Sequence, residues 1–178
     1  MNYFEVFGLP KRLNLDLKQL EKAFHELSRK YHPDYYTNAP IEDRQRALQM
    51  TASLNDAYRT LRHPVRRVEH LVALEGFKPD GSKVPKSFLM EVFEINEQLE
   101  EVKAGGASKE QVESLKREID GRAQAFESQL QAAAEEWDKL DASDASDAQR
   151  KQQLTRLTEI LSESSYIRNL QRELEEKS

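Results

Sequence analysis

The stretch SRKYHPDYYTN, residues 28–38, marks the point at which a helical pattern in this chain stops abruptly. Apolar residues before it recur at the spacing of one helix face. They are Leu20, Ala23, Phe24, Leu27 and Tyr31. Pro33 disfavours helical geometry at the residue before it, so we expect the helix to end at His32. The sequence therefore predicts a helix that begins at Asp16 and is closed by a His-Pro-Asp tripeptide.

The face of this helix opposite the apolar stripe is basic. It carries Lys18, Lys22, His25 and Arg29. An amphipathic helix buries one side and presents the other to solvent. A single lysine there is ordinarily just a solvated residue, but four basic residues beside the tripeptide favour a binding role.

Helices on both sides of the tripeptide complete a first module. Pro40 is placed to open a long helix, which His63-Pro64 should end. The segment VRRVEHLVALEG, residues 65–76, predicts a shorter helix that stops at Gly76. Two long helices joined by a short loop should lie antiparallel as a hairpin.

A second helical module follows residues 77–85, FKPDGSKVP, which have the composition of a turn and are the predicted linker. Apolar residues then recur every three or four positions over residues 88–102, 112–137 and 154–174. Short connections join these segments, so residues 86–178 should form an antiparallel three-helix bundle. The expected fold class is all-α, with modules at 1–76 and 86–178.

Composition excludes several classes of protein. The chain has 178 residues and no cysteine, which rules out disulfides, thiolate zinc sites and iron–sulfur clusters held by its own thiolates. No basic leader precedes an apolar run, and no run reaches the roughly 20 residues of a membrane span. A cytoplasmic location without membrane contact is predicted. The net charge is −5, with an excess of basic residues only in the first module.

The tripeptide alone leaves three interpretations open. His32 and Asp34 could be two metal ligands, but a third donor is not apparent. They could be a base and its orienting carboxylate, but no serine or cysteine nucleophile accompanies them. They could also be an ordinary loop, the commonest role of such residues.

A short aromatic helix, a basic helix, His-Pro-Asp and a long helix resemble the J domain of DnaJ-type co-chaperones. The segments YFEVFGLP (3–10) and YHPD (31–34) carry this resemblance. TLRHPVRRVEHLVALEGF (60–77) and SFLMEVFEINEQLEEV (87–102) are in addition similar to the HscB family of iron–sulfur cluster biogenesis. The cysteine zinc motif of many eukaryotic members is missing, so the chain resembles bacterial members.

The resemblance implies a co-chaperone and not an enzyme, with no cofactor or metal. His32, Pro33, Asp34 and the basic helix face would engage a DnaK-type chaperone, HscA in this family, and stimulate its ATPase. No glycine-rich phosphate-binding loop is present, so ATP hydrolysis would belong to that partner.

The first bundle helix carries a second candidate surface. Leu89, Met90 and Phe93 fall on the side opposite the apolar stripe of Phe88 and Val92, bordered by Glu94, Glu97 and Glu101. An exposed apolar patch with an acidic rim is typical of an interaction site. The alternative is that these residues pack on the first module or widen the bundle core. The resemblance implies that this surface binds the iron–sulfur scaffold protein IscU, together with Tyr166 and Ile167 of the last helix.

Other functions remain as alternatives. A general J protein would bind many unfolded clients, and the heptad-like spacing over residues 88–174 also fits a structural or dimerisation protein. A metal hydrolase around His32 and Asp34 is a more distant alternative. Nucleic-acid binding is disfavoured by the acidic balance and by the lack of aromatic residues among the basic ones.

Overall fold

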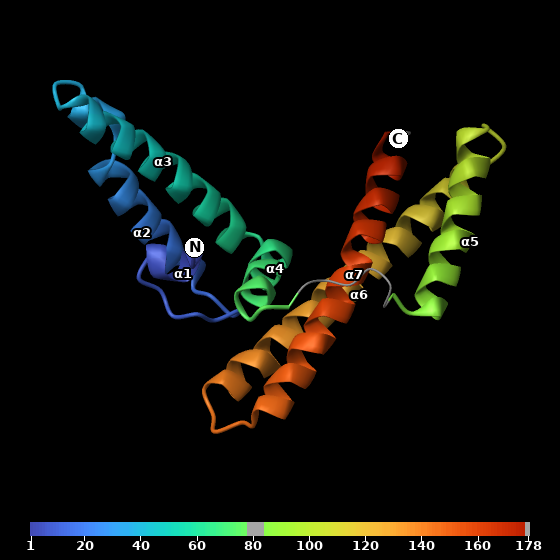
Figure 1. The fold of residues 1–178 in the computed structure, drawn as a ribbon. Helices are drawn as coiled ribbons and strands as arrows, with labels where there is room; N and C mark the ends of the chain where they lie inside the picture. Colours follow the sequence, from blue (N-terminus) through green and yellow to red (C-terminus); the bar gives the residue numbers. More distant parts are fainter. Residues whose placement is uncertain (78–83, 177–178) are drawn as a thin grey trace. The chain divides into compact units, whose positions relative to one another are not determined.

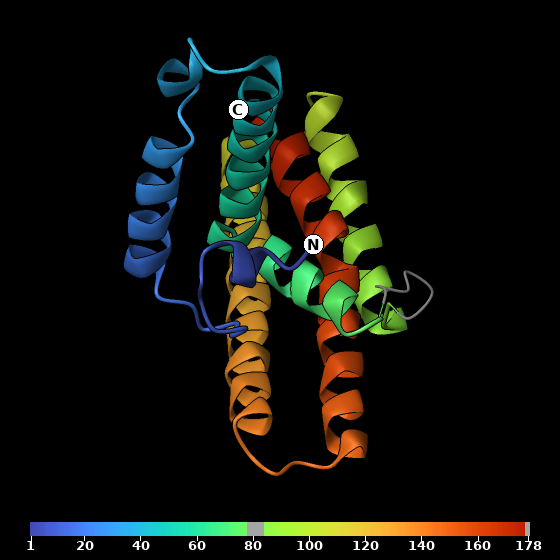
Figure 2. The same cartoon turned by 60° about the vertical axis from the view of Figure 1, so that its left-hand side comes forward.

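The computed structural model describes residues 1–77 and 84–176, and every regular element within them is helical. The predicted all-α fold class is therefore confirmed. The chain divides into two compact units, Met1–Gly76 and Phe77–Ser178 (Figures 1 and 2). Most of the expected linker, residues 77–85, lies outside the described residues. No helix among the described residues is long and apolar enough to cross a bilayer.

The first unit is built around the hairpin that the sequence predicted. Its elements are α1 (Tyr3–Val6), α2 (Leu17–Lys30), the 3-10 helix η1 (Pro33–Tyr36), α3 (Ile41–Arg62) and α4 (Pro64–Leu74). The carboxylate of Asp16 caps α2 by accepting hydrogen bonds from the N–H groups of Lys18 and Gln19. Pro40 directly precedes α3 and is not its first helical residue, and η1 occupies part of the stretch expected to be an open loop.

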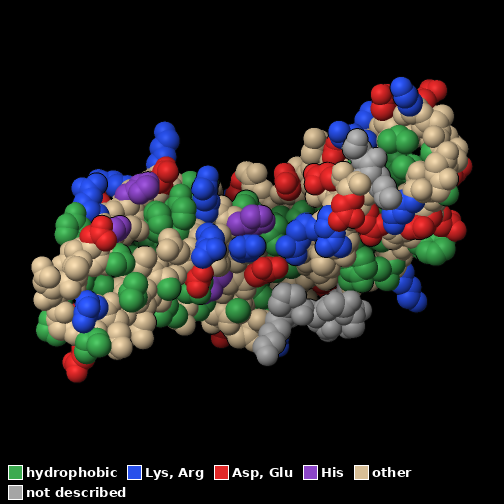
Figure 3. Space-filling view, turned by 90° about the horizontal axis from the view of Figure 1, so that it is seen from above, with side chains coloured by type: hydrophobic (Ala, Val, Ile, Leu, Met, Phe, Trp, Pro, Cys, Tyr) green, Lys and Arg blue, Asp and Glu red, His purple; other side chains and the backbone are tan. Residues whose placement is uncertain are grey.

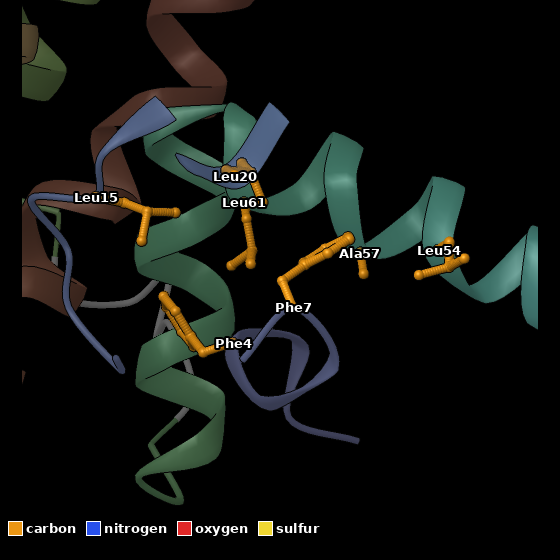
Figure 4. Close-up of a cluster of buried hydrophobic side chains, with 7 residues drawn as sticks. All are labelled: Phe4, Phe7, Leu15, Leu20, Leu54, Ala57 and Leu61. Carbon is orange, nitrogen blue, oxygen red and sulfur yellow. The ribbon is translucent and has the colours of Figure 1, made fainter. Parts of the chain in front are cut away.

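Seven buried apolar side chains hold this unit together (Figure 4). They are Phe4, Phe7, Leu15, Leu20, Leu54, Ala57 and Leu61. The segment that leads into α2 is also fixed by polar contacts. Arg67 of α4 donates hydrogen bonds to the carbonyl oxygens of Leu13 (2.8 Å) and Leu61 (2.6 Å), and Lys11 forms an ion pair with Glu75. These contacts tie α4 and the residue after it to the segment before α2 and to the end of α3.

A histidine of α4 makes the stability of the first unit depend on pH. The backbone N–H of Tyr3 donates to Nε2 of His70 over 3.1 Å, and the two rings stack with centroids 4.3 Å apart. Nε2 must be unprotonated to accept this bond. Burial, and to a lesser extent the positive N-terminus, lower the pKa of His70 from its ordinary value of 6.5.

We therefore expect stability to fall as the pH drops below about 6.5, because the unfolded chain then binds a proton that the folded unit resists. Urea unfolding at pH 7.5 and at pH 5.5 measures this loss. His70→Gln keeps a side-chain acceptor but does not titrate, so the difference between the two pH values should be smaller in that variant. An equal loss in both proteins would contradict the assignment.

The second unit consists of α5 (Lys86–Lys103), α6 (Lys109–Asp141) and α7 (Asp147–Glu175), which run antiparallel in succession (Figure 1). Capping boxes at Ser108 and Ser146 begin the two long helices. At 1.5 Å per residue α5 spans about 27 Å, whereas α6 and α7 span about 50 Å and 44 Å. The predicted bundle is present, but α5 can cover only part of the hairpin formed by α6 and α7.

Candidate functional site

The His-Pro-Asp turn joins α2 to η1. His32 has extended backbone angles, φ −61° and ψ 129°, as expected for a residue that precedes a proline. Pro33 opens η1, where its missing N–H costs no hydrogen bond. The turn is thus set locally by Pro33 and needs no buried contacts of its own.

The side chains of His32 and Asp34 lie next to each other and face solvent. Nδ1 of His32 accepts a hydrogen bond from the backbone N–H of Asp34 over 3.3 Å and lies 3.5 Å from its Oδ2. Their side chains are 54% and 86% exposed. Since an Nδ1 that accepts is unprotonated, Nε2 carries the ring proton and can donate it outward. The turn therefore presents a donor and a carboxylate acceptor side by side.

Hydroxyl groups fix the position of this turn on the hairpin. Tyr36 Oη donates to the carbonyl of Lys30 over 3.3 Å, and Thr37 Oγ1 donates to that of Asp34 over 2.9 Å. Thr51 Oγ1, on α3, lies 3.1 Å from the carbonyl oxygen of Tyr31 at the end of α2. These contacts restrict the turn before any partner arrives, which lowers the entropy lost on binding.

Tyr35 also belongs to this surface, although its sequence context does not distinguish it. It is 71% exposed, and its ring stands edge-on to that of His32 with centroids 6.2 Å apart. A tyrosine in a predicted loop gives no indication of the direction in which its side chain points. Only the one turn of 3-10 helix shows that Tyr35 points outward while Tyr36 turns back to bond α2.

The basic stripe of α2 is exposed, as expected. Lys18, Lys22, His25 and Arg29 all face solvent, away from the buried Leu20. Glu21 lies on the same side, with Oε1 3.8 Å from Nε2 of His25, so the surface is basic but not uniformly so. All four histidines lie in the first unit, and Figure 3 shows them with both basic and acidic side chains beside them.

The candidate surface on α5 is also exposed. Leu89, Met90 and Phe93 are 39%, 66% and 62% accessible, whereas Phe88 and Val92 on the opposite side are buried. Glu94, Glu97 and Glu101 are exposed next to them. Figure 3 shows hydrophobic and acidic side chains side by side on this unit. The alternative that these apolar residues widen the bundle core is therefore wrong.

The two residues expected from the last helix are less exposed than those of α5. Ile167 is only 3% exposed and belongs to the bundle core, so its placement on the surface was wrong. Tyr166 is half-buried, and its ring packs edge-on against Phe88 with centroids 5.9 Å apart. Tyr166 therefore packs against α5 through Phe88 and stays partly accessible.

Within residues 1–77 and 84–176, no group of three or more His, Asp or Glu side chains is arranged to hold a metal ion. His32 and Asp34 thus stand without a third ligand among the described residues. The arrangement at the turn suits docking to another protein.

Two family models cover nearly the whole chain. The DnaJ domain matches residues 2–70, and the HSCB C-terminal oligomerisation domain matches residues 84–175. The chain belongs to the HscB family of co-chaperones. The HscB homologues of two Vibrio cholerae strains, classical Ogawa O395 and El Tor Inaba N16961, are each 37% identical over 142 residues. That alignment covers 77% of this chain and 83% of each homologue.

Solved HscB structures share the fold. Chaperone HscB from Vibrio cholerae superposes with a TM-score of 0.79 at 30% identity, over 98% of this chain and 96% of the other. The human co-chaperone protein HscB superposes with a TM-score of 0.78 over 99% of this chain and 82% of its own, but at 22% identity it shows the fold alone. An HscB co-chaperone with a J domain has an Hsp70-type chaperone as its partner, and His32-Pro33-Asp34 lies within the matched J domain.

Proposed function

We propose that this HscB co-chaperone delivers the scaffold protein IscU to the DnaK-type chaperone HscA and stimulates its ATPase, which promotes iron–sulfur cluster transfer. Residues 1–76 act as the J domain, residues 77–85 as the linker and residues 86–178 as the scaffold-binding bundle, in the cytoplasm. The observation that carries the proposal is the exposed, restrained turn of His32, Pro33 and Asp34 beside the basic face of α2.

The His-Pro-Asp turn and the basic stripe of α2 contact HscA. The Nε2 proton of His32 and the carboxylate of Asp34 make directed polar contacts, for which Pro33 and Thr51 hold the turn ready. Lys18, Lys22, His25 and Arg29 attract an acidic surface of the chaperone and raise the rate of encounter more than the final affinity. Salt should therefore slow association by screening the stripe.

IscU occupies the exposed face of α5. Leu89, Met90 and Phe93 supply apolar area that monomeric proteins rarely leave uncovered as a cluster. Glu94, Glu97 and Glu101 form a polar rim that selects a partner with basic residues at matching positions. Tyr166 contributes by packing behind Phe88.

The protein can deliver IscU to HscA because one chain carries both binding surfaces. IscU held by the bundle is brought to the chaperone at a local concentration set by the link between the two units. Hydrolysis is carried out by HscA, and the turn couples it to the arrival of cargo. A general J protein for unfolded clients would use the same turn but would not prefer folded IscU.

Single-turnover ATP hydrolysis by HscA tests the proposal. With the full chain and IscU present together, we expect a greater rate than the sum of the stimulations by each alone. Replacing IscU with a denatured, unrelated protein should leave only the stimulation by the chain alone. Equal stimulation by IscU and by the denatured protein would instead favour the general J protein.

A further inference from the structure

A single arginine of α6 contacts both other helices of the bundle. Nη1 of Arg122 lies 3.5 Å from Oε2 of Glu91 on α5, and Nη2 lies 3.4 Å from Oε2 of Glu163 on α7. Its guanidinium also stands over the ring of Phe88, 4.7 Å from the centroid. Arg122 thus joins three helices through two ion pairs and a cation–π contact.

This cluster is partly removed from water. Glu163 is only 9% exposed, and burial raises the pKa of its carboxyl, while the charge of Arg122 opposes that shift. Ion pairs with such burial add little net stability, because desolvation offsets the attraction between the charges. Their effect is geometric: with the helices placed as they are, Arg122 reaches both carboxylates and the ring at once.

The contacts on α5 bracket part of the exposed face. Phe88 and Glu91 are about one helical turn apart, and Leu89 and Met90 lie between them in sequence. Because the helix is rigid over one turn, holding Phe88 and Glu91 in place also sets the direction in which Leu89 and Met90 point. At the far end of α5, Lys103 forms a 3.0 Å ion pair with Glu173 of α7.

We propose that Arg122 is a positioning residue, which sets the rotation of α5 on the hairpin of α6 and α7 and so the direction in which Leu89, Met90 and Phe93 point. An α5 of 18 residues covers only part of that hairpin, and its buried stripe of Phe88, Val92, Ile95 and Leu99 is purely apolar. Apolar contacts are non-directional and tolerate a small rotation. Arg122 supplies the directional contacts that prevent this rotation of α5.

Hydrogen exchange of the full-length protein tests this without any partner. In Arg122→Gln, we expect the amides of residues 88–95 to exchange about tenfold faster, since the ion pair with Glu91 and the cation–π contact with Phe88, which oppose local opening of α5, are lost. Arg117→Gln is the matched control, because Arg117 is exposed on the same helix and its only described side-chain bond is to the carbonyl of Glu113. Arg122→Lys keeps the positive charge but lacks the planar guanidinium, so the exchange rates of residues 88–95 should lie between those of the wild type and Arg122→Gln.

Glu91→Gln gives a second, milder variant should Arg122→Gln fail to fold. It leaves the pair of Arg122 with Glu163 in place, so faster exchange should be confined to α5. Unchanged exchange in α5 for both variants would overturn the proposal.

Affinity for IscU provides the second measurement, and this part rests on the proposed function. We expect Arg122→Gln to weaken IscU binding and Arg122→Lys to restore part of it, with Arg117→Gln unchanged. Weaker binding with unchanged exchange would mean that Arg122 contacts the partner directly, against a positioning role. If the wild type itself does not bind IscU, the proposed function fails, while the exchange data still decide the role of Arg122.

Discussion

His32→Gln is expected to weaken the stimulation of HscA strongly while leaving IscU binding unchanged. Gln cannot place an acceptor against the N–H of Asp34 and a donor outward with the rigidity of a ring. Loss of a central polar contact typically costs about 2 kcal/mol or more. The concentration required for half-maximal stimulation should therefore rise about thirtyfold, as measured by single-turnover ATP hydrolysis.

The chain provides its own matched control in a second His-Pro pair. His63 precedes Pro64 with comparable extended angles, φ −89° and ψ 120°, but joins α3 to α4 away from the turn. His63→Gln should leave stimulation close to that of the wild type. If His32→Gln stimulated HscA as well as His63→Gln does, the turn could not be the element that couples to hydrolysis.

The elements that local rules govern could be predicted from the sequence. Pro33 disfavours helical geometry at His32 whatever the rest of the chain does, so the end of α2 could be predicted to within two residues, at His32 against the observed Lys30. The helical repeat likewise placed Phe88 and Val92 inside and Met90 and Phe93 outside. Both predictions depend on neighbours in sequence and not on how helices meet.

The errors arose where a family resemblance was preferred to the local pattern, or where the contacts between elements decide. Ile167 was assigned to the surface through a family resemblance, although it shares the apolar repeat of Leu170 and Leu174, and the structure buries all three. The role of Arg122 could not be predicted, because Glu91 and Glu163 meet it only once the helices have a definite rotation. Tyr35 was missed because one turn of 3-10 helix sends it outward.

Replacing Leu89, Met90 and Phe93 together by alanine is expected to eliminate measurable binding of IscU. Apolar anchors that fill a partner's surface dominate interface energies, and losing three of them should weaken affinity at least about a hundredfold, or roughly 3 kcal/mol. Because all three side chains are exposed, truncating them removes few internal contacts. Unfolding stability should stay within about 1 kcal/mol of the wild type. Isothermal titration with IscU and urea unfolding measure the two quantities.

Removing a similar exposed apolar area from the first unit tests whether IscU binds the α5 face specifically or binds any exposed hydrophobic surface. Ile41 and Leu48 on α3 are 63% and 57% exposed, close to the values for Met90 and Phe93. Ile41→Ala with Leu48→Ala should leave IscU affinity unchanged if the face of α5 is the binding site. The α5 triple variant should in turn keep the stimulation of HscA in the absence of IscU, because the turn at His32 is untouched. Comparable affinity losses in both variants would mean that exposed hydrophobic area in general captures the partner, which would favour a chaperone for unfolded clients over a dedicated carrier of one scaffold.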